Sequence, residues 1–246
     1  VAFTHCSNIV GSMHPVREWT DKIHAAGALA IVDGVSYAGH GLPDVEALGV
    51  DIYLFSLYKV FGPHLGVMVM RKAVNEQLPY QGHFFNVDHP TDRCTPAGPD
   101  HAQIASVNGV IDYFEAVYSH HFGDDDATQA QKTSRVRALF QHTERRNLKP
   151  LLEFLANRQG VHMVGKTVTR NRAPTVSFTV DNRDPADIAA QLAKQKIGIG
   201  NGNCYAYRLM GALGIPPDQG VVRTSFVHYT TREEVLSLIG ALDKIL

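Results

Sequence analysis

The chain of 246 residues carries 23 Lys and Arg against 24 Asp and Glu, which gives a formal net charge of −1. This balance argues against the strongly basic surface that nucleic-acid or anionic-membrane binding requires. Its apolar runs are short, and none approaches the ~20 residues of a membrane-spanning helix. Three cysteines, Cys6, Cys94 and Cys204, are too few for a disulfide scaffold, so we expect a cytoplasmic protein with reduced thiols.

The chain opens on Val1-Ala2-Phe3-Thr4, which has the pattern of a buried strand and follows no start signal. We therefore expect a C-terminal part of a longer protein, with a processed full-length protein as the alternative. Short apolar runs then alternate with helical stretches up to about residue 115. The predicted strands are Ala2–Thr4, Ala28–Val32, Ile52–Phe55 and Val67–Met70, with helices from Pro15 and over Pro43–Leu48.

This alternation predicts an α/β fold with a mostly parallel sheet. Further on, helices are expected over about 101–118 and 127–147, the second interrupted or restarted at Pro150. The remaining pattern predicts a small α+β domain. Its expected elements are strands Val161–Val164, Thr175–Val180 and Val221–Val227, helices Pro185–Gln195 and Tyr205–Leu213, and a last helix opened by a Thr231/Glu234 capping box. We place the domain boundary between residues 122 and 123, so that 1–122 belongs to the large domain and 123–246 is the small C-terminal one.

Polar side chains follow three of the predicted strands. The segments are Thr4-His5-Cys6-Ser7-Asn8, Val32-Asp33-Gly34-Val35-Ser36 and Phe55-Ser56-Leu57-Tyr58-Lys59. In a parallel sheet the carboxyl ends of neighbouring strands meet at one edge, where such folds bind ligands. We therefore expect these three segments to converge.

A carboxylate and an amine on neighbouring strand ends suit pyridoxal phosphate. That cofactor needs a lysine to hold its aldehyde and an anion beside its ring nitrogen. Lys59 provides the amine and Asp33 the anion, while Ser56 and Tyr58 offer hydroxyl donors for the phosphate. Taken singly, each residue has an ordinary explanation: an Asp at a strand end usually caps a turn, and a Lys is usually solvated. No spacing typical of a metal site occurs, so we expect no metal.

Over nearly its whole length the sequence resembles the class V aminotransferase family of fold-type-I pyridoxal phosphate enzymes, and specifically its cysteine-desulfurase-like branch. The resemblance rests on the runs THCSNIVG, IVDGVSYAGH and FSLYKVFGPHLGVM. It implies that Asn8 contacts the ring oxygen of the cofactor, that Asp33 faces the ring nitrogen, and that Lys59 holds the aldehyde. It also implies a phosphate contact for Ser56 and a homodimer.

Other motif positions agree with the family or depart from it. The run VVRTSFVHYTTREEV resembles the segment whose arginine binds the substrate α-carboxylate, which implies that role for Arg223. Ser36 stands where the family has a glutamine, and is a shorter partner for the ring oxygen. Tyr58 replaces the histidine before the lysine; it keeps a hydroxyl for the phosphate but cannot carry a proton as an imidazole does.

Cys204 lies in the run Gly200-Asn201-Gly202-Asn203-Cys204, where a desulfurase has its cysteine loop but where the family's arginine is missing. It is a candidate nucleophile that would accept sulfur as a persulfide, or else a small packed residue at a helix start. The sequence thus predicts an enzyme acting at Cα or Cβ of a small amino acid, as a C–S lyase or desulfurase. An aminotransferase or epimerase, and a non-catalytic homologue without cofactor, remain the alternatives.

Overall fold

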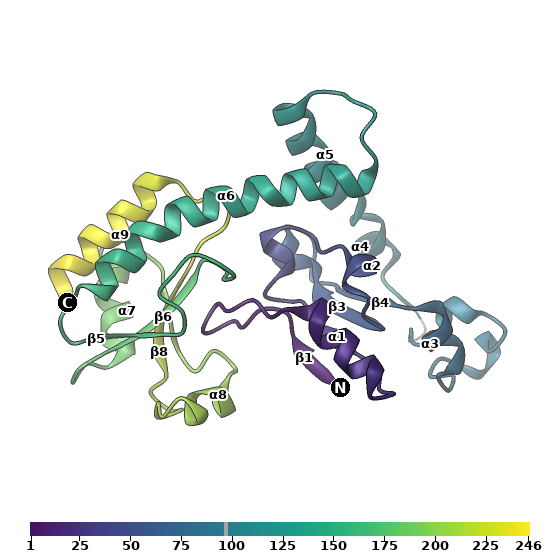
Figure 1. Ribbon diagram of the computed structural model, residues 1–246, viewed down its shortest axis with the longest axis horizontal. Helices are drawn as coiled ribbons and strands as arrows, with labels where there is room; N and C mark the ends of the chain where they lie inside the picture. Colours follow the sequence, from purple (N-terminus) through teal and green to yellow (C-terminus); the bar gives the residue numbers. More distant parts are fainter. Residues whose placement is uncertain (96–97) are drawn as a thin grey trace. The chain divides into compact units, whose positions relative to one another are not determined.

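The computed structural model describes residues 1–95 and 98–246, which form two compact units (Figure 1). The first unit consists of Val1–His5 and Pro15–Val136, and the second of Cys6–His14 and Arg137–Leu246. The segment after the first strand therefore leaves the first unit at Cys6 and returns at Pro15. The domain boundary expected after residue 122 stays a prediction.

The first unit is built on a four-stranded sheet of order β1-β2-β3-β4. The strands are β1 (Ala2–Thr4), β2 (Ile31–Asp33), β3 (Ile52–Ser56) and β4 (Gly66–Met70). β1, β2 and β3 are parallel, whereas β4 returns antiparallel to β3. This confirms the α/β prediction, and it places the carboxyl ends of β1, β2 and β3 at one edge.

Short helices connect and follow these strands. They are α1 (Val16–Ala25), η1 (Ala38–His40), α2 (Val45–Leu48), η2 (Leu57–Val60), α3 (Lys72–Gln77), η3 (Phe84–Asn86), η4 (Pro90–Asp92), α4 (His101–Ala105) and α5 (Asn108–Phe122). The single helix expected over 101–118 is wrong, since it divides into α4 and α5. The Ser106 hydroxyl donates to the Gln103 carbonyl at 2.7 Å, a local bond that competes with a continuing helix.

The second unit carries an antiparallel sheet of order β5-β6-β8-β7. Its strands are β5 (Val161–Val164), β6 (Thr175–Val180), β7 (Gly200–Gly202) and β8 (Val221–Ser225). The strand β7 was missed, because Gly-Asn-Gly has no apolar alternation and pairs only through its backbone. The helices are α7 (Pro185–Lys194), α8 (Tyr207–Ala212), α9 (Arg232–Ile245) and the second part of α6 (Gln129–Ala156).

The helix α6 continues through Pro150, so the interruption expected there is wrong. A proline removes one helical hydrogen bond and usually kinks or ends a helix. Here Leu148, Leu151 and Leu155 on either side of it are all buried in the core of the second unit. Burial of this apolar face favours a continuous helix. The capping box of α9 is confirmed, with the Glu234 N–H donating to Thr231 Oγ1 and the Thr231 N–H to Glu234 Oε2.

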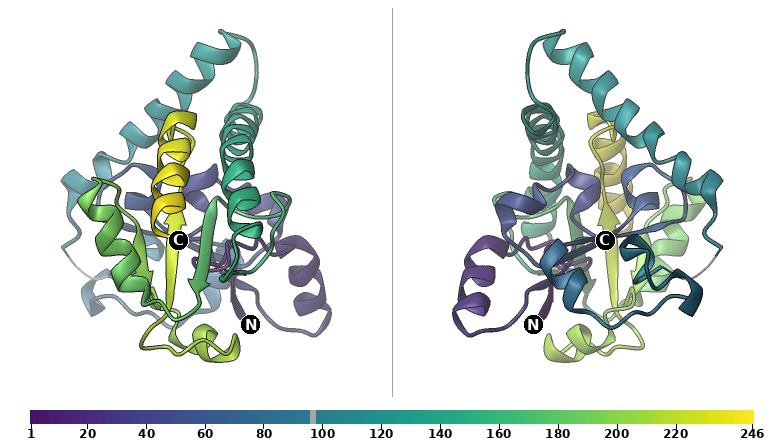
Figure 2. Two further views of the ribbon diagram at one scale, coloured as in Figure 1. Left: turned by 90° about the vertical axis from the view of Figure 1, so that its left-hand side faces the viewer. Right: turned by 90° about the vertical axis from the view of Figure 1, so that its right-hand side faces the viewer.

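The sheet of the second unit has two different faces. On one, Val222 and Phe178 pack with the apolar sides of α6, α7 and α9, which cover that face (Figure 2). Because side chains alternate along a strand, Val221 and Arg223 project to the other face. There Val221 packs with Ile9 and Met210 in a smaller cluster. None of the described helices is both long and apolar enough to cross a membrane.

Asp51 stabilises the amino-terminal edge of the first unit's sheet. Its buried carboxylate accepts hydrogen bonds from the Ala30 N–H and from His24 Nε2, both at 2.7 Å. Burial by itself would raise the pKa of Asp51, but these two hydrogen bonds and the charges of His24 and Arg71 outweigh it, so the pKa lies below the ordinary value.

We expect Asp51→Asn to lower the free energy of unfolding by about 1–3 kcal/mol, because buried donors lose a charged acceptor. A carboxyl whose pKa is lowered by folding contributes stability above its ordinary pKa and loses it as pH falls through the folded value. The difference between wild type and variant should therefore shrink below about pH 4. Denaturant unfolding at several pH values measures it. Asp21→Asn, which breaks only an exposed pair with Arg17, is the matched control and should change little.

Candidate active site

Asp33 is the last residue of β2 and lies at the carboxyl edge of the first unit's sheet. The His5 N–H donates to its carbonyl at 2.8 Å, and the Val35 N–H donates to its Oδ1 at 2.9 Å. The side chain is exposed, and no cation within the described residues pairs with it. Asp33 therefore presents a carboxylate oxygen at this edge.

The turn after Asp33 is held by a close approach between Gly34 and Tyr53. A Cβ atom on Gly34 would lie 2.1 Å from the Tyr53 ring, so only glycine is accommodated. The Gly34 N–H donates to Leu54 O at 2.7 Å, and the N–H groups of Tyr37 and Ala38 both donate to Gly34 O at 2.9 Å. Ser36 sits, half-buried, within this turn. The backbone that carries Asp33 and Ser36 is thus tied to β3.

His5 lies beneath the same turn, and sequence reasoning gave it no role. Its buried ring stacks on Tyr37 with the centroids 3.6 Å apart, and its Nδ1 lies 2.8 Å from Tyr53 Oη. These three side chains support the turn from Asp33 to Tyr37. The sequence does not indicate this supporting role, because a histidine after a strand is a common pattern. In addition, both partners, Tyr37 and Tyr53, lie far along the chain from His5.

Lys59 lies in η2, which follows β3 directly. Its carbonyl oxygen packs against Gly39, where a Cβ atom would lie only 2.5 Å from it. The exposed amine lies 5.6 Å from the centroid of the Tyr58 ring, and it pairs with no carboxylate of the described residues. Ser56 ends β3 just before. Phe61 closes η2 with a φ of 70°, and the Gly62 N–H donates to Leu57 O.

The pairing of the strands brings Asp33 and Lys59 to the same edge of the sheet. Asp33 is the register partner of Leu54 in the parallel neighbour β3, and Lys59 follows the end of that strand. An unpaired carboxylate and an unpaired amine therefore follow adjacent parallel strands. Such an arrangement can hold a ligand that offers a carbonyl to the amine and a cationic or N–H group to the carboxylate.

The second unit contains the other residues singled out in the sequence. Arg223 lies on β8 between Ser177 of β6 and Gly200 of β7. Its Nη1 donates to the carbonyl of Asn8 at 3.1 Å, whereas its buried Nε has no hydrogen-bond partner in the part of the chain that the structure describes. A buried guanidinium donor without an acceptor is costly, and it suits an anionic ligand with two oxygens.

Cys204 lies in the loop between β7 and α8, next to Asn8. The Asn8 Nδ2 donates to the Cys204 carbonyl at 2.8 Å. Cys204 and Tyr205 both have positive φ angles, 47° and 64°, in a region that non-glycine residues rarely occupy. The half-buried side chain of Cys204 packs on the cluster formed by Ile9, Met210 and Val221. Its thiol lies 3.9 Å from the carbonyl oxygens of Asn201 and Gly202.

Cys6 differs from Cys204 in being fully buried. Burial raises the pKa of its thiol to about 12, so it is protonated at neutral pH. Arg172, also buried, donates to the carbonyls of Val10, Ala173 and Thr175 and so joins the segment Cys6–His14 to the rest of the second unit. The same burial lowers the pKa of its guanidinium. Cys6 thus has a structural place in the second unit.

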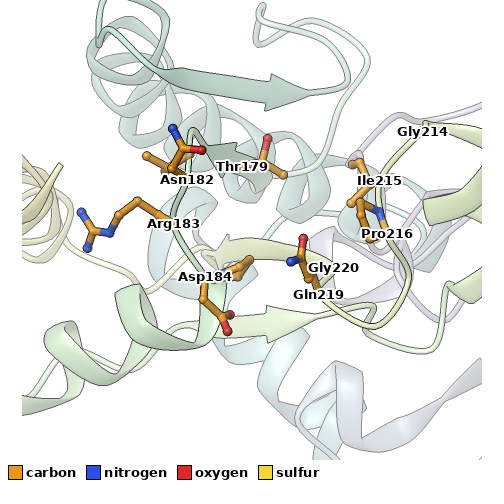
Figure 3. A pocket seen from close by; sticks show the side chains of 11 residues that line it. Thr179, Asn182, Arg183, Asp184, Gly214, Ile215, Pro216, Gln219 and Gly220 are labelled. Atoms are coloured by element: carbon orange, nitrogen blue, oxygen red, sulfur yellow. The ribbon is translucent and has the colours of Figure 1, made fainter.

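A separate hollow of about 610 Å³ opens in the second unit beside the start of α7 (Figure 3). Its charged side chains are already bonded: Arg183 donates to Ile245 O at 2.9 Å, and Asp184 accepts from the Ala186 N–H. None of the sequence-predicted site residues lines it. The predicted residues instead fall into two groups, one in each unit. Asp33, Ser36, Ser56, Tyr58 and Lys59 belong to the first unit, and Asn8, Cys204 and Arg223 to the second.

The model of a known family, described as aminotransferase class-V, matches residues 1–238. The chain therefore belongs to the class V aminotransferase family, whose members use pyridoxal phosphate. Its similarity to cysteine desulfurases confirms the cysteine-desulfurase-like branch and the fold-type-I architecture expected from the sequence.

Two curated relatives and one solved structure illustrate the similarity. The chain is 36% identical over 250 residues to the aminotransferase-like protein FGM3 of Gibberella zeae. That alignment covers 100% of this chain and 59% of FGM3. It is 32% identical over 253 residues to the cysteine desulfurase-like protein ustD of Aspergillus flavus, covering 100% and 54%. It superposes on the apo cysteine desulfurase of Thermococcus onnurineus NA1 with a TM-score of 0.83 at 27% identity, covering 100% and 59%. The chain thus spans less than two thirds of each of them.

Gly39→Ala tests the packing that fixes Lys59. The new methyl group would collide with the Lys59 carbonyl, and overpacking of this kind costs about 1–3 kcal/mol. We expect a corresponding fall in the midpoint of denaturant unfolding. Gly109→Ala, at a position on α5 where a Cβ meets nothing, is the matched control and should gain about 0.5–1 kcal/mol. Equal stability of Gly39→Ala and wild type would contradict the close approach.

Proposed function

We propose that this protein is a pyridoxal phosphate-dependent enzyme that acts at Cα or Cβ of a small amino acid, as a cysteine-desulfurase-like C–S lyase or desulfurase. The observation that carries the proposal is the unpaired amine of Lys59 beside the end of β3 and the unpaired carboxylate of Asp33 at the end of the parallel neighbour β2. Membership of the class V family and similarity to cysteine desulfurases support it.

The residues present fit that cofactor. Among the described residues, Lys59 has no acidic partner and the buried Nε of Arg223 has no acceptor, while Asp33 has a carboxylate oxygen available. When bound, pyridoxal phosphate supplies an electron-poor ring that accepts the electron pair left at Cα. Lys59 would hold the aldehyde and then carry the proton at Cα. The Asp33 carboxylate would accept the ring N–H and keep that nitrogen protonated.

Further polar side chains have supporting roles in this proposal. Ser56 and Tyr58 would donate hydroxyl hydrogen bonds to the phosphate, and Asn8 and Ser36 would bind the ring oxygen. Arg223 would grip the substrate α-carboxylate through parallel N–H bonds and so orient the bond to be broken at Cα. The family resemblance assigns these roles, and the unpartnered Nε of Arg223 supports the last. We further infer a homodimer and a cytoplasmic location from the same resemblance.

Covalent capture tests the role of Lys59. After incubation with pyridoxal phosphate, the wild type should show a visible absorption band, and borohydride reduction should fix the cofactor on the peptide containing residue 59. Lys59→Ala should lose both signals. Within the described residues of the first unit, Lys59 is the lysine that follows the carboxyl end of a strand next to Asp33. The matched control is Lys72→Ala, which removes an exposed lysine that forms an ion pair with Glu76. A colourless wild type would favour the non-catalytic homologue.

Cys204→Ala tests whether the reaction passes through a protein persulfide. We expect sulfide release from cysteine to stay within about threefold of wild type, because the Cys204 side chain packs on an apolar cluster and the change is small. Pyruvate as the co-product would indicate elimination, and alanine would indicate sulfur removal. A loss of about a thousandfold would instead make Cys204 the sulfur acceptor.

A further inference from the structure

The loop that closes the β3–β4 hairpin gathers three polar side chains. Its base is fixed, since Ser56 pairs with Gly66 across the hairpin and the Leu57 N–H donates to Leu65 O at 2.8 Å. Between these points the loop carries Tyr58, Lys59 and His64. Because the ends are tied, these side chains are confined to a short stretch beside the end of β3.

Within that loop His64 lies against Tyr58. The two rings stack with their centroids 4.9 Å apart and an angle of 21° between their planes. The amine of Lys59 lies 5.6 Å from the centroid of the same Tyr58 ring. All three side chains are exposed, so their polar atoms are available to a ligand. Neither the sequence motifs nor the proposed reaction has used His64.

The loop itself carries no acidic side chain, which favours an anion there. Residues 52–75 contain no Asp or Glu, while the loop contributes Lys59 and His64. An imidazole offers an N–H donor in either protonation state, and hydrogen bonds to an ionised phosphate are about twice as strong as neutral ones. Tyr58 and His64, held face to face, therefore bring a hydroxyl and an imidazole N–H, two donors suited to a phosphate group, into one short loop.

We propose that His64 donates a hydrogen bond to the phosphate of pyridoxal phosphate, beside the hydroxyl of Tyr58. This inference rests on the proposed function and names a further binding residue of the same site. The rival explanation is that the His64 ring only supports Tyr58 by stacking. The two explanations predict different affinities for pyridoxal phosphate in His64→Phe, whose ring can stack on Tyr58 but cannot donate a hydrogen bond.

The test compares the affinities of the full-length apoprotein for pyridoxal phosphate and for pyridoxal, which lacks the phosphate, each by absorbance titration. In His64→Ala and in His64→Phe we expect the affinity for pyridoxal phosphate to fall about 10- to 100-fold. The affinity for pyridoxal should change by less than about threefold. Inorganic phosphate should also compete with pyridoxal phosphate less effectively in the variants than in the wild type.

His83→Ala is the matched control, because His83 is another exposed histidine of the first unit and stacks on Phe85 at 5.0 Å. It should leave both affinities unchanged. Wild-type affinity for pyridoxal phosphate in His64→Phe would overturn the proposal in favour of stacking alone. An equal loss for both ligands would also overturn it, since the loop as a whole would then be disturbed. Failure of the wild type to bind pyridoxal phosphate would instead remove the proposed function itself.

Discussion

The parallel pairing of β2 with β3 is the constraint on which the candidate site depends. Neighbouring strands lie about 4.8 Å apart, so residues that follow their carboxyl ends start from adjacent points of the backbone. Asp33 ends β2 and Lys59 follows β3, which gives one edge both an acid and an amine. An antiparallel pairing would have sent the two groups to opposite edges. The chemistry proposed for this protein is therefore a consequence of the strand direction.

Residues without a chemical role hold this edge in place. The Tyr53 ring lies close to Gly34, and the Lys59 carbonyl lies close to Gly39. A Cβ atom at either glycine would prevent this close packing. His5 contributes a ring stacked on Tyr37 and a hydrogen bond with Tyr53 Oη. A binding group is useful only if its supporting backbone cannot move away, and these contacts provide that rigidity without touching a ligand.

The sheet of the second unit has an apolar face that packs in the core and an opposite face that carries polar groups. Alternation along β8 sends Val222 into the helix-covered core and leaves Arg223 on the other face, where it contacts the carbonyl of Asn8. The same face carries the apolar cluster on which Cys204 packs. On this face the Nε of Arg223 is buried and has no hydrogen-bond partner among the described residues. Burial of a polar donor without a partner is unfavourable unless a ligand supplies one.

The sequence by itself determined the features that depend on local pattern: the α/β alternation, the capping box of α9, and the placement of Asp33 and Lys59 after apolar strands. Only the tertiary structure decided the rest. The strand β7, the course of α6 through Pro150, and the contacts of His5 and His64 arise from backbone pairing, buried leucines and ring stacking. The leucines of α6 do have helical spacing in the sequence, but only their burial shows that they outweigh the proline. The partners of β7 and His5 lie on other elements and leave no local signal, and the stacking of His64 on Tyr58 depends on how the hairpin loop closes.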